Sequence, residues 1–166
     1  MIARLQRRGA LRRAWLMAAG LLVLGGGAMA AEPVAAPVCS DAAGETRLLV
    51  KVLGMRSAKG NVTITVYPDD VRRFLAPGGK LLRQRVPVTG SVTAACFVVP
   101  AAGVYAIAIY HDEDDNHHFN RSFIGLPTEG YGFSQNPKTL VGLPSLNEVR
   151  FTAKLGDNPI DIRLSY

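Results

Sequence analysis

The segment His111–Asn120 concentrates the residues of this chain that are best able to bind a metal ion. Its acidic and amide side chains fall at relative positions 1, 3, 5 and 9, and the backbone carbonyl of a histidine falls at position 7: Asp112, Asp114, Asn116, Asn120 and His118. Calcium is a hard cation that takes about six to eight oxygen ligands, and alternate residues of a tight loop can turn their oxygens toward one centre. The pattern predicts a calcium site, for which Glu129 would supply a further carboxylate.

The acidic run matches only the first half of an EF-hand calcium loop. The full loop needs Gly at position 6 and Glu at position 12, where this chain has His117 and Phe123. A solvated acidic turn at the end of a strand is therefore the alternative interpretation, in which no metal binds.

The histidines of the same run suggest a second kind of metal. His111, His117 and His118 lie among carboxylates, and imidazole with carboxylate can hold zinc or copper. His117 and His118 are adjacent, so in an extended backbone their side chains diverge. The alternative is that these are ordinary surface histidines.

A glycine-rich segment, residues 125–137, follows the acidic run and contains aromatic and amide side chains. Tyr131, Phe133, Gln135 and Asn136 could face a ligand or a partner. Alternatively, Tyr131 and Phe133 plug the open end of the fold, since buried aromatics dominate the energetics of cores.

Motifs that carry catalysis are missing from the sequence. There is no G-x-S-x-G elbow and no H-E-x-x-H pair. We therefore predict that the protein is not an enzyme. Two functions remain open: a binding or accessory module stabilised by calcium, or an envelope structural protein whose long loop contacts an envelope or extracellular partner without metal.

The first 30 residues have the pattern of a signal peptide. Five arginines precede an 11-residue apolar run, residues 14–24, and Ala28-Met-Ala30 fits a cleavage site. Cleavage would leave 14 of the 19 basic residues against 13 acidic ones, a net charge of +1 instead of +6. This predicts a periplasmic or secreted protein, without a membrane span after cleavage, and gives no support to nucleic-acid binding.

Cys39 and Cys96 are the only cysteines, and an even count in an exported chain predicts one disulfide. A metal thiolate pair is the alternative, although the spacing is not that of a zinc site.

Alternation of apolar and polar residues predicts strands after an N-terminal arm, residues 31–45. The expected strands cover residues 46–53, 61–67, 81–88, 91–99, 104–110, 149–154 and 160–166. About seven short strands without a long helix indicate an all-β domain, residues 46–166, with the two-sheet sandwich of immunoglobulin-like or transthyretin-like proteins. Residues 111–146 show no periodicity but contain several aromatics, which predicts one long ordered loop.

Several stretches together resemble a known bacterial family. They are residues 53–60, Pro100–Glu113 with its His-Asp-Glu end, Gly125–Ser134 with Gly-Tyr-Gly-Phe-Ser, and residues 162–166. The chain is similar over residues 39–166 to the exported family called domain of unknown function 2141. This resemblance implies a periplasmic or secreted β-sandwich with no assigned activity. Against the family pattern, Asp115 and His117 stand where glycines are usual, and Asn120 replaces an aspartate.

Overall fold

The computed structural model describes residue 39, residues 44–138 and residues 142–166. The chain separates into residues 1–32 and a unit of residues 33–166, and every described residue belongs to the second unit. The predicted signal peptide and most of the predicted arm lie outside the described residues. Among the described residues, no helix has the length and apolar character needed to cross a membrane.

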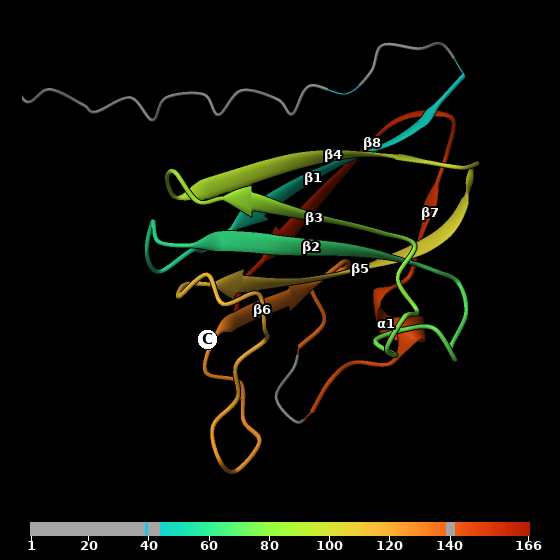
Figure 1. Cartoon of the computed structure of the whole chain (residues 1–166). Coiled ribbons are helices and arrows are strands. Elements are labelled where there is room, and N and C mark those ends of the chain that lie inside the picture. Colours follow the sequence, from blue (N-terminus) through green and yellow to red (C-terminus); the bar gives the residue numbers. More distant parts are fainter. Residues whose placement is uncertain (1–38, 40–43, 139–141) are drawn as a thin grey trace, which may run out of the picture. The chain divides into compact units, whose positions relative to one another are not determined.

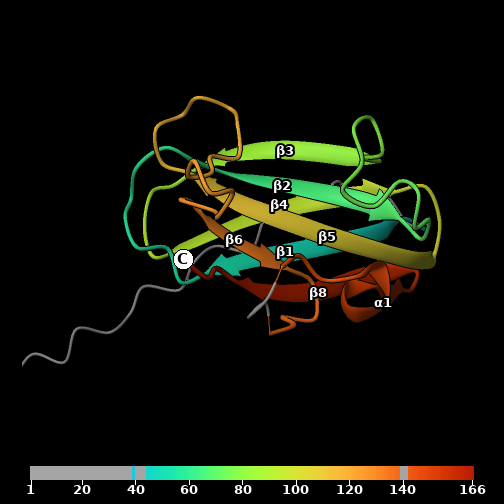
Figure 2. The same ribbon diagram turned by 90° about the horizontal axis from the view of Figure 1, so that it is seen from below.

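Two β-sheets form the described domain (Figure 1), which confirms the predicted two-sheet sandwich. The three-stranded sheet has the order β4 (Val92–Val99), β1 (Thr46–Leu53), β8 (Gly156–Arg163). The second sheet has the order β3 (Leu82–Pro87), β2 (Asn61–Pro68), β5 (Gly103–Asp112), β6 (Gly130–Phe133), and β7 (Phe151–Ala153) pairs with β5. In Figure 2 the strands of the two sheets overlap, with β4 visible between β2 and β5 and with β1 and β8 below β5 in the view. The described part of the chain thus has eight strands, one more than expected.

The space between the sheets is filled by the apolar residues that alternate along the strands. Leu48, Val50 and Val52 of β1 are fully buried, as are Val62, Ile64 and Val66 of β2. Burial of each such side chain contributes about 1.5–3 kcal/mol, which explains why strict alternation in the sequence identified these strands. On β4 the buried residues are Thr93, Ala95, Phe97 and Val99, so Cys96 lies on the outer face.

A second, smaller hydrophobic cluster lies on the outer face of the five-stranded sheet. It joins residues of β2, β5 and β6 to the short helix α1 (Leu146–Val149): Tyr67, Ala106, Phe133, Leu146 and Val149. The helix begins with a capping box, in which Glu148 accepts a hydrogen bond from the Ser145 backbone N–H. Phe133 is thus buried as one interpretation expected, but beneath α1 on the sheet face and not at an open end of the sandwich.

The predicted long loop, residues 111–146, contains more regular structure than expected. β5 continues to Asp112, β6 occupies residues 130–133, and α1 begins at Leu146. The sequence hides β6 because Gly130 and Gly132 have weak strand propensity. Both glycines are required by close packing, since a Cβ at Gly130 would lie 2.4 Å from the Tyr166 ring and one at Gly132 would lie 2.6 Å from the Arg163 carbonyl oxygen.

The boundaries of the last two strands also differ from the expected ones. Val149 ends α1, so β7 begins only at Phe151, and β8 runs over residues 156–163 instead of 160–166. β8 pairs in parallel with β1 from its first residue, Gly156, which is opposite Thr46. Pro159 and Asn158 conceal this strand in the sequence, but the edge position of β8 tolerates a proline.

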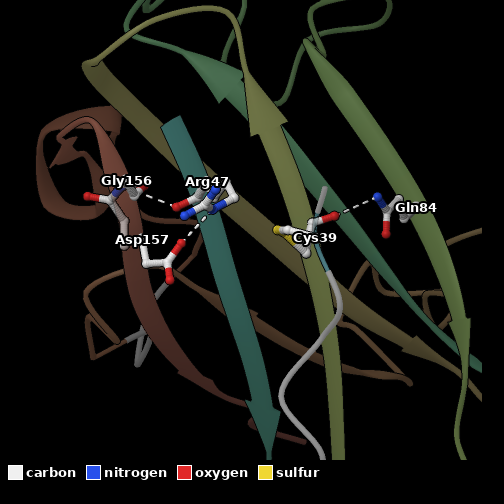
Figure 3. Close-up of a disulfide and its surroundings, with 7 residues drawn as sticks. Cys39, Arg47, Gln84, Gly156 and Asp157 are labelled. Atoms are coloured by element: carbon white, nitrogen blue, oxygen red, sulfur yellow. Dashed lines mark hydrogen bonds and ion pairs between the residues drawn. A yellow bond between two sulfur atoms is a disulfide. The ribbon is translucent and has the colours of Figure 1, made fainter. Parts of the chain in front are cut away.

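Cys39 and Cys96 form a disulfide, with their Cα atoms 5.5 Å apart. The bond attaches Cys39 to the outer face of β4 (Figure 3), where Gln84 of β3 donates a hydrogen bond to the Cys96 carbonyl. On the same sheet, Arg47 of β1 forms an ion pair with Asp157 of β8. The disulfide joins residues 57 positions apart. In the chain-entropy description, closing a loop of this length stabilises the folded state by about 4 kcal/mol.

Candidate metal centre

Asp112 ends β5 and lies fully buried, opposite Asn61 of β2. Its carboxylate accepts hydrogen bonds from the backbone N–H groups of Asn116 (3.1 Å) and His117 (2.9 Å). The Asn61 side chain donates a longer one, at 3.4 Å. A buried carboxylate needs such donors to replace its water. The donors fold residues 113–117 back over the end of the strand.

Close chain approach at this strand end depends on Gly60, which precedes β2. Gly60 has a φ of +64°, and a Cβ there would lie only 1.9 Å from the Asp112 carbonyl oxygen. Any other residue would push the turn before β2 away from the end of β5. The glycine of the Lys59-Gly60 pair therefore positions the acidic loop, a role that the sequence analysis did not assign to it.

Asp112, Asp114 and Glu129 are brought together at this end of the sheet. One carboxylate oxygen from each lies within 4.8 Å of the others. Asp114 is exposed, whereas Glu129, which immediately precedes β6, is only 5% exposed. The geometry thus joins two acids of the run at 112–115 to a third, Glu129, which comes more than a dozen residues later in the chain.

The two predicted amide ligands contact the same carboxylates through their nitrogens. Asn120 donates from its side chain to Asp114 (3.0 Å) and Glu129 (3.3 Å), and from its backbone to Glu129 (3.0 Å). Asn116 donates from its side chain to Asp114 (2.9 Å) and to the Asn120 oxygen (3.1 Å). A half-turn about the Cβ–Cγ bond of each asparagine would present the amide oxygen in place of the nitrogen.

His118 lies next to Asn116 in the acidic loop. Its backbone N–H donates to the Asn116 side-chain oxygen at 2.8 Å, and its own side chain is exposed. The role of its backbone carbonyl as a calcium ligand stays a prediction.

A second group of ligating side chains shares Asp112. Its carboxylate lies within 4.8 Å of atoms of Asp115 and His117. Both of these residues have positive φ values, +56° and +66°, at the positions where glycine is usual in the resembling family. Asp115 also accepts a hydrogen bond from the Asn61 side chain. The predicted ligand set omitted Asp115, although its place in the acidic run was a signal.

The pKa of Glu129 is raised above its ordinary value of 4.5. Burial is the largest cause, and the negative charges of Asp112, Asp114 and Glu113 add to it, while the hydrogen bond from the Asn120 backbone opposes it. Among the described residues, no ion pair is formed by Asp112, Asp114 or Glu129. The negative charges of these three acids therefore repel one another.

His111 is excluded as a ligand by its own hydrogen bonds. It is fully buried, and its Nε2 donates to the Lys59 carbonyl at 2.8 Å. Its Nδ1 accepts from the Tyr166 hydroxyl at 2.7 Å, since a ring whose Nε2 carries the proton has Nδ1 free to accept. Both ring nitrogens are thus used inside the fold, and only His117 of the three histidines belongs to a ligating group.

The side chains predicted to face a ligand divide between two places. Tyr131 and Phe133 project from β6, whereas Gln135 and Asn136 turn toward neighbouring backbone. Asn136 donates to the Asp161 carbonyl (2.9 Å) and accepts from the Arg163 N–H (2.8 Å), which joins it to the edge of β8. Its amide is therefore used within the fold.

Tyr131 and Phe133 belong to a row of aromatic rings on the outer face of the sheet. Tyr110, Phe119, Tyr131 and Phe133 follow one another with ring centroids 5.5, 6.0 and 6.1 Å apart. They line a cleft of about 220 Å³, with Arg83 and Arg121 among its other residues. Ligand pockets usually measure about 300–1,000 Å³, so the cleft is small for an organic ligand.

The fold and this carboxylate group define a β-sandwich with an acidic site where β5 ends and β6 begins. Residues 50–161 match the family model of uncharacterised proteins conserved in bacteria, DUF2141. The chain belongs to this family, as the resemblance predicted. No curated protein and no solved structure matches the chain.

Proposed function

We propose that this protein is an exported binding or accessory module that binds one calcium ion at Asp112, Asp114 and Glu129. The ion would hold the end of β5, the acidic loop and the start of β6 in one arrangement. The observation that carries the proposal is the meeting of three carboxylates within 4.8 Å, two of them in buried residues.

Electrostatics support a cation at this place. Two buried carboxylates beside a third, exposed one give an unfavourable local charge, which a divalent ion would reverse. Burial raises the pKa of Glu129, and the charges of the neighbouring acids raise it further. Calcium fits because the three acids and the rotated amides of Asn116 and Asn120 would offer only oxygens.

Export is supported by the disulfide and by the N-terminal sequence pattern. Disulfides persist in oxidising compartments and are rare in the cytosol of mesophiles. A periplasmic or secreted location would also expose the site to the higher calcium concentrations at which extracellular modules bind, in the range of about 10⁻⁴–10⁻³ M.

Calorimetric titration with calcium tests the binding, together with thermal unfolding in calcium and in EGTA. At a free calcium concentration of about one hundred times Kd, linkage predicts a gain of about 2.7 kcal/mol in the free energy of unfolding. Absence of both binding heat and a thermal shift with calcium, magnesium and zinc would overturn the proposal.

Matched variants locate the ion. Glu129→Gln and Asp114→Asn keep the shape of the side chain and remove its charge, so each should abolish or strongly weaken calcium binding. Asp161→Asn makes the same kind of change at an exposed acid on β8 and should bind like the wild type. If His117→Gln abolishes binding and Glu129→Gln does not, the ion occupies the second group, Asp112–Asp115–His117, and the assignment to Glu129 is wrong.

A metal-free envelope interaction protein is the second candidate function. An exposed apolar cluster in the long segment after β5 favours it: Phe123, Ile124 and Leu126. The two functions can be tested separately, because none of these three residues is a proposed calcium ligand.

A further inference from the structure

Residues 121–127 form a small hairpin whose tip is apolar and exposed. The side chain of Phe123 is 100% exposed, that of Ile124 65% and that of Leu126 60%. Single exposed apolar residues are ordinary on protein surfaces, but three in four consecutive positions mark a place of interaction. The hairpin extends from the sandwich beyond β6, as the orange loop farthest from the sheets in Figure 1.

Internal hydrogen bonds hold the hairpin in shape. Arg121 and Pro127 form an isolated antiparallel bridge, and the Ser122 N–H donates to the Leu126 carbonyl at 2.8 Å. The Gly125 N–H donates to the Ser122 carbonyl at 2.8 Å, and the Ser122 hydroxyl accepts from the Leu126 N–H at 3.2 Å. Much of the polar backbone at the tip is thus satisfied within the hairpin, which lowers the cost of moving it into an apolar phase.

The hairpin and the residues beside it in the chain carry positive charge only, and the acids Asp114 and Glu129 contact Asn120 at its base. Residues 117–128 contain no acid, and Arg121 is their only arginine or lysine. The Arg121 guanidinium lies 5.0 Å from the centroid of the Phe119 ring and donates to the Gly125 carbonyl at 3.3 Å. An arginine beside an apolar tip can keep its charge at the level of lipid phosphates while the apolar side chains enter the acyl region.

We propose that this hairpin inserts into a lipid surface and anchors the domain there. A lipid surface suits it better than a protein partner, because specific protein interfaces use roughly 20–30 residues on each side. The convex tip offers only three large apolar side chains, and a bilayer accepts such a tip without a complementary shape. Insertion does not require the proposed calcium ion, so the two proposals can fail separately.

Tryptophan fluorescence can report the environment of the tip directly. The full chain has one tryptophan, Trp15, which Trp15→Phe removes. Phe123→Trp is introduced in that background, and the protein is mixed in EGTA with vesicles of phosphatidylcholine and phosphatidylglycerol. We expect the emission to move to shorter wavelength and to be quenched by lipids brominated in their acyl chains.

A matched probe separates insertion of the hairpin from attachment of any other segment. Leu155 lies between β7 and β8, which is the opposite end of β5 from the acidic loop, and is 68% exposed. Leu155→Trp in the same background should show neither the emission shift nor the quenching. Equal signals from both probes, or none from Phe123→Trp, would overturn the proposal, and the second result would point to a protein partner.

Removal of one apolar side chain gives a quantitative check. Leu126→Ser, read through the Phe123→Trp signal as lipid is added, should weaken binding to vesicles by about tenfold. Leu155→Ser makes the same change at a similarly exposed leucine and should leave the binding unchanged. Equal binding by both variants would contradict insertion through the tip.

Discussion

Two glutamates at the same end of the sandwich have opposite electrostatic surroundings. Glu113, just after β5, is bound by the Arg56 guanidinium and by the Ser57 hydroxyl at 2.6 Å. The Arg56 hydrogen bond is the largest cause that lowers the pKa of Glu113. Glu129, just before β6, is buried among other acids, and its pKa is raised. Among the described residues, Arg56 forms an ion pair with Glu113, whereas no ion pair is formed by Glu129.

This difference separates a structural acid from a candidate ligand. Arg56 also lies 4.4 Å from the centroid of the Tyr166 ring, and the Tyr166 hydroxyl in turn binds His111. Glu113 therefore belongs to a network that joins the turn before β2 to the end of β5. Glu129 has backbone and amide donors but no cationic partner among the described ion pairs, so an external cation would gain most there.

The largest effect should come from Asp112, which serves both the fold and the proposed ion. Asp112→Ala would remove the buried acceptor of the Asn116 and His117 backbone N–H groups and of the Asn61 side chain, at a cost of about 1–3 kcal/mol in the free energy of unfolding. Denaturant unfolding in EGTA measures this cost without a contribution from calcium. Asp161→Ala should change the stability by less than about 0.5 kcal/mol. Equal stabilities of the two variants would show that the carboxylate of Asp112 does not organise the loop.

Glu129→Gln, unlike Asp112→Ala, should increase the free energy of unfolding in the absence of metal. The folded pKa of Glu129 lies above its ordinary value of 4.5, so the folded state holds this proton more tightly than the unfolded chain. Its contribution to stability is therefore complete below about pH 4.5 and is lost as pH rises through the raised pKa. At neutral pH without calcium, we expect Glu129→Gln to be more stable than the wild type by up to about 1 kcal/mol.

Calcium should reverse this order, since the wild type gains stability from the ion and Glu129→Gln does not. Thermal unfolding of both proteins in EGTA and in calcium, across pH 4 to 8, measures the crossing. If Glu129→Gln is less stable than the wild type in EGTA throughout this range, the negative charge of Glu129 does not destabilise the folded state.

Strands with strict alternation could be predicted from the sequence, and so could the residue types of the acidic group. β1, β2 and β5 were found because one face of each is apolar and lies in a single core. Asp112, Asp114 and Glu129 were selected as oxygen donors, and the structure brings them together. The sequence does not reveal β6, because its glycines are required by close packing against Tyr166 and Arg163, which are distant in sequence.

Partnerships between distant segments account for the other misses. His111 was a candidate ligand until its contacts with Lys59 and Tyr166 were known, and both are more than 50 residues away in the chain. The pairing of Arg56 with Glu113 spans 57 residues. Residue types indicate which chemistry is available. Whether each side chain already has a hydrogen-bond or ion-pair partner within the fold depends on the register of the sheets.

The smallest effect should come from Glu113→Gln, which breaks the ion pair with Arg56. The Arg56 side chain is about half exposed, so solvent screening limits the expected loss at neutral pH to about 0.5 kcal/mol. The folded pKa of Glu113 is lowered, so its contribution is present above the ordinary value of 4.5 and is lost as pH falls through the folded pKa. Stability measured against pH should therefore show the variant and the wild type converging in acid, whereas Glu129→Gln and the wild type diverge as pH rises.

Glu113→Gln should also leave the affinity for calcium almost unchanged, because the Arg56 guanidinium already neutralises the Glu113 carboxylate. A large loss of affinity in that variant would mean that Glu113 leaves Arg56 to join the ion, and the division between the two glutamates would no longer hold.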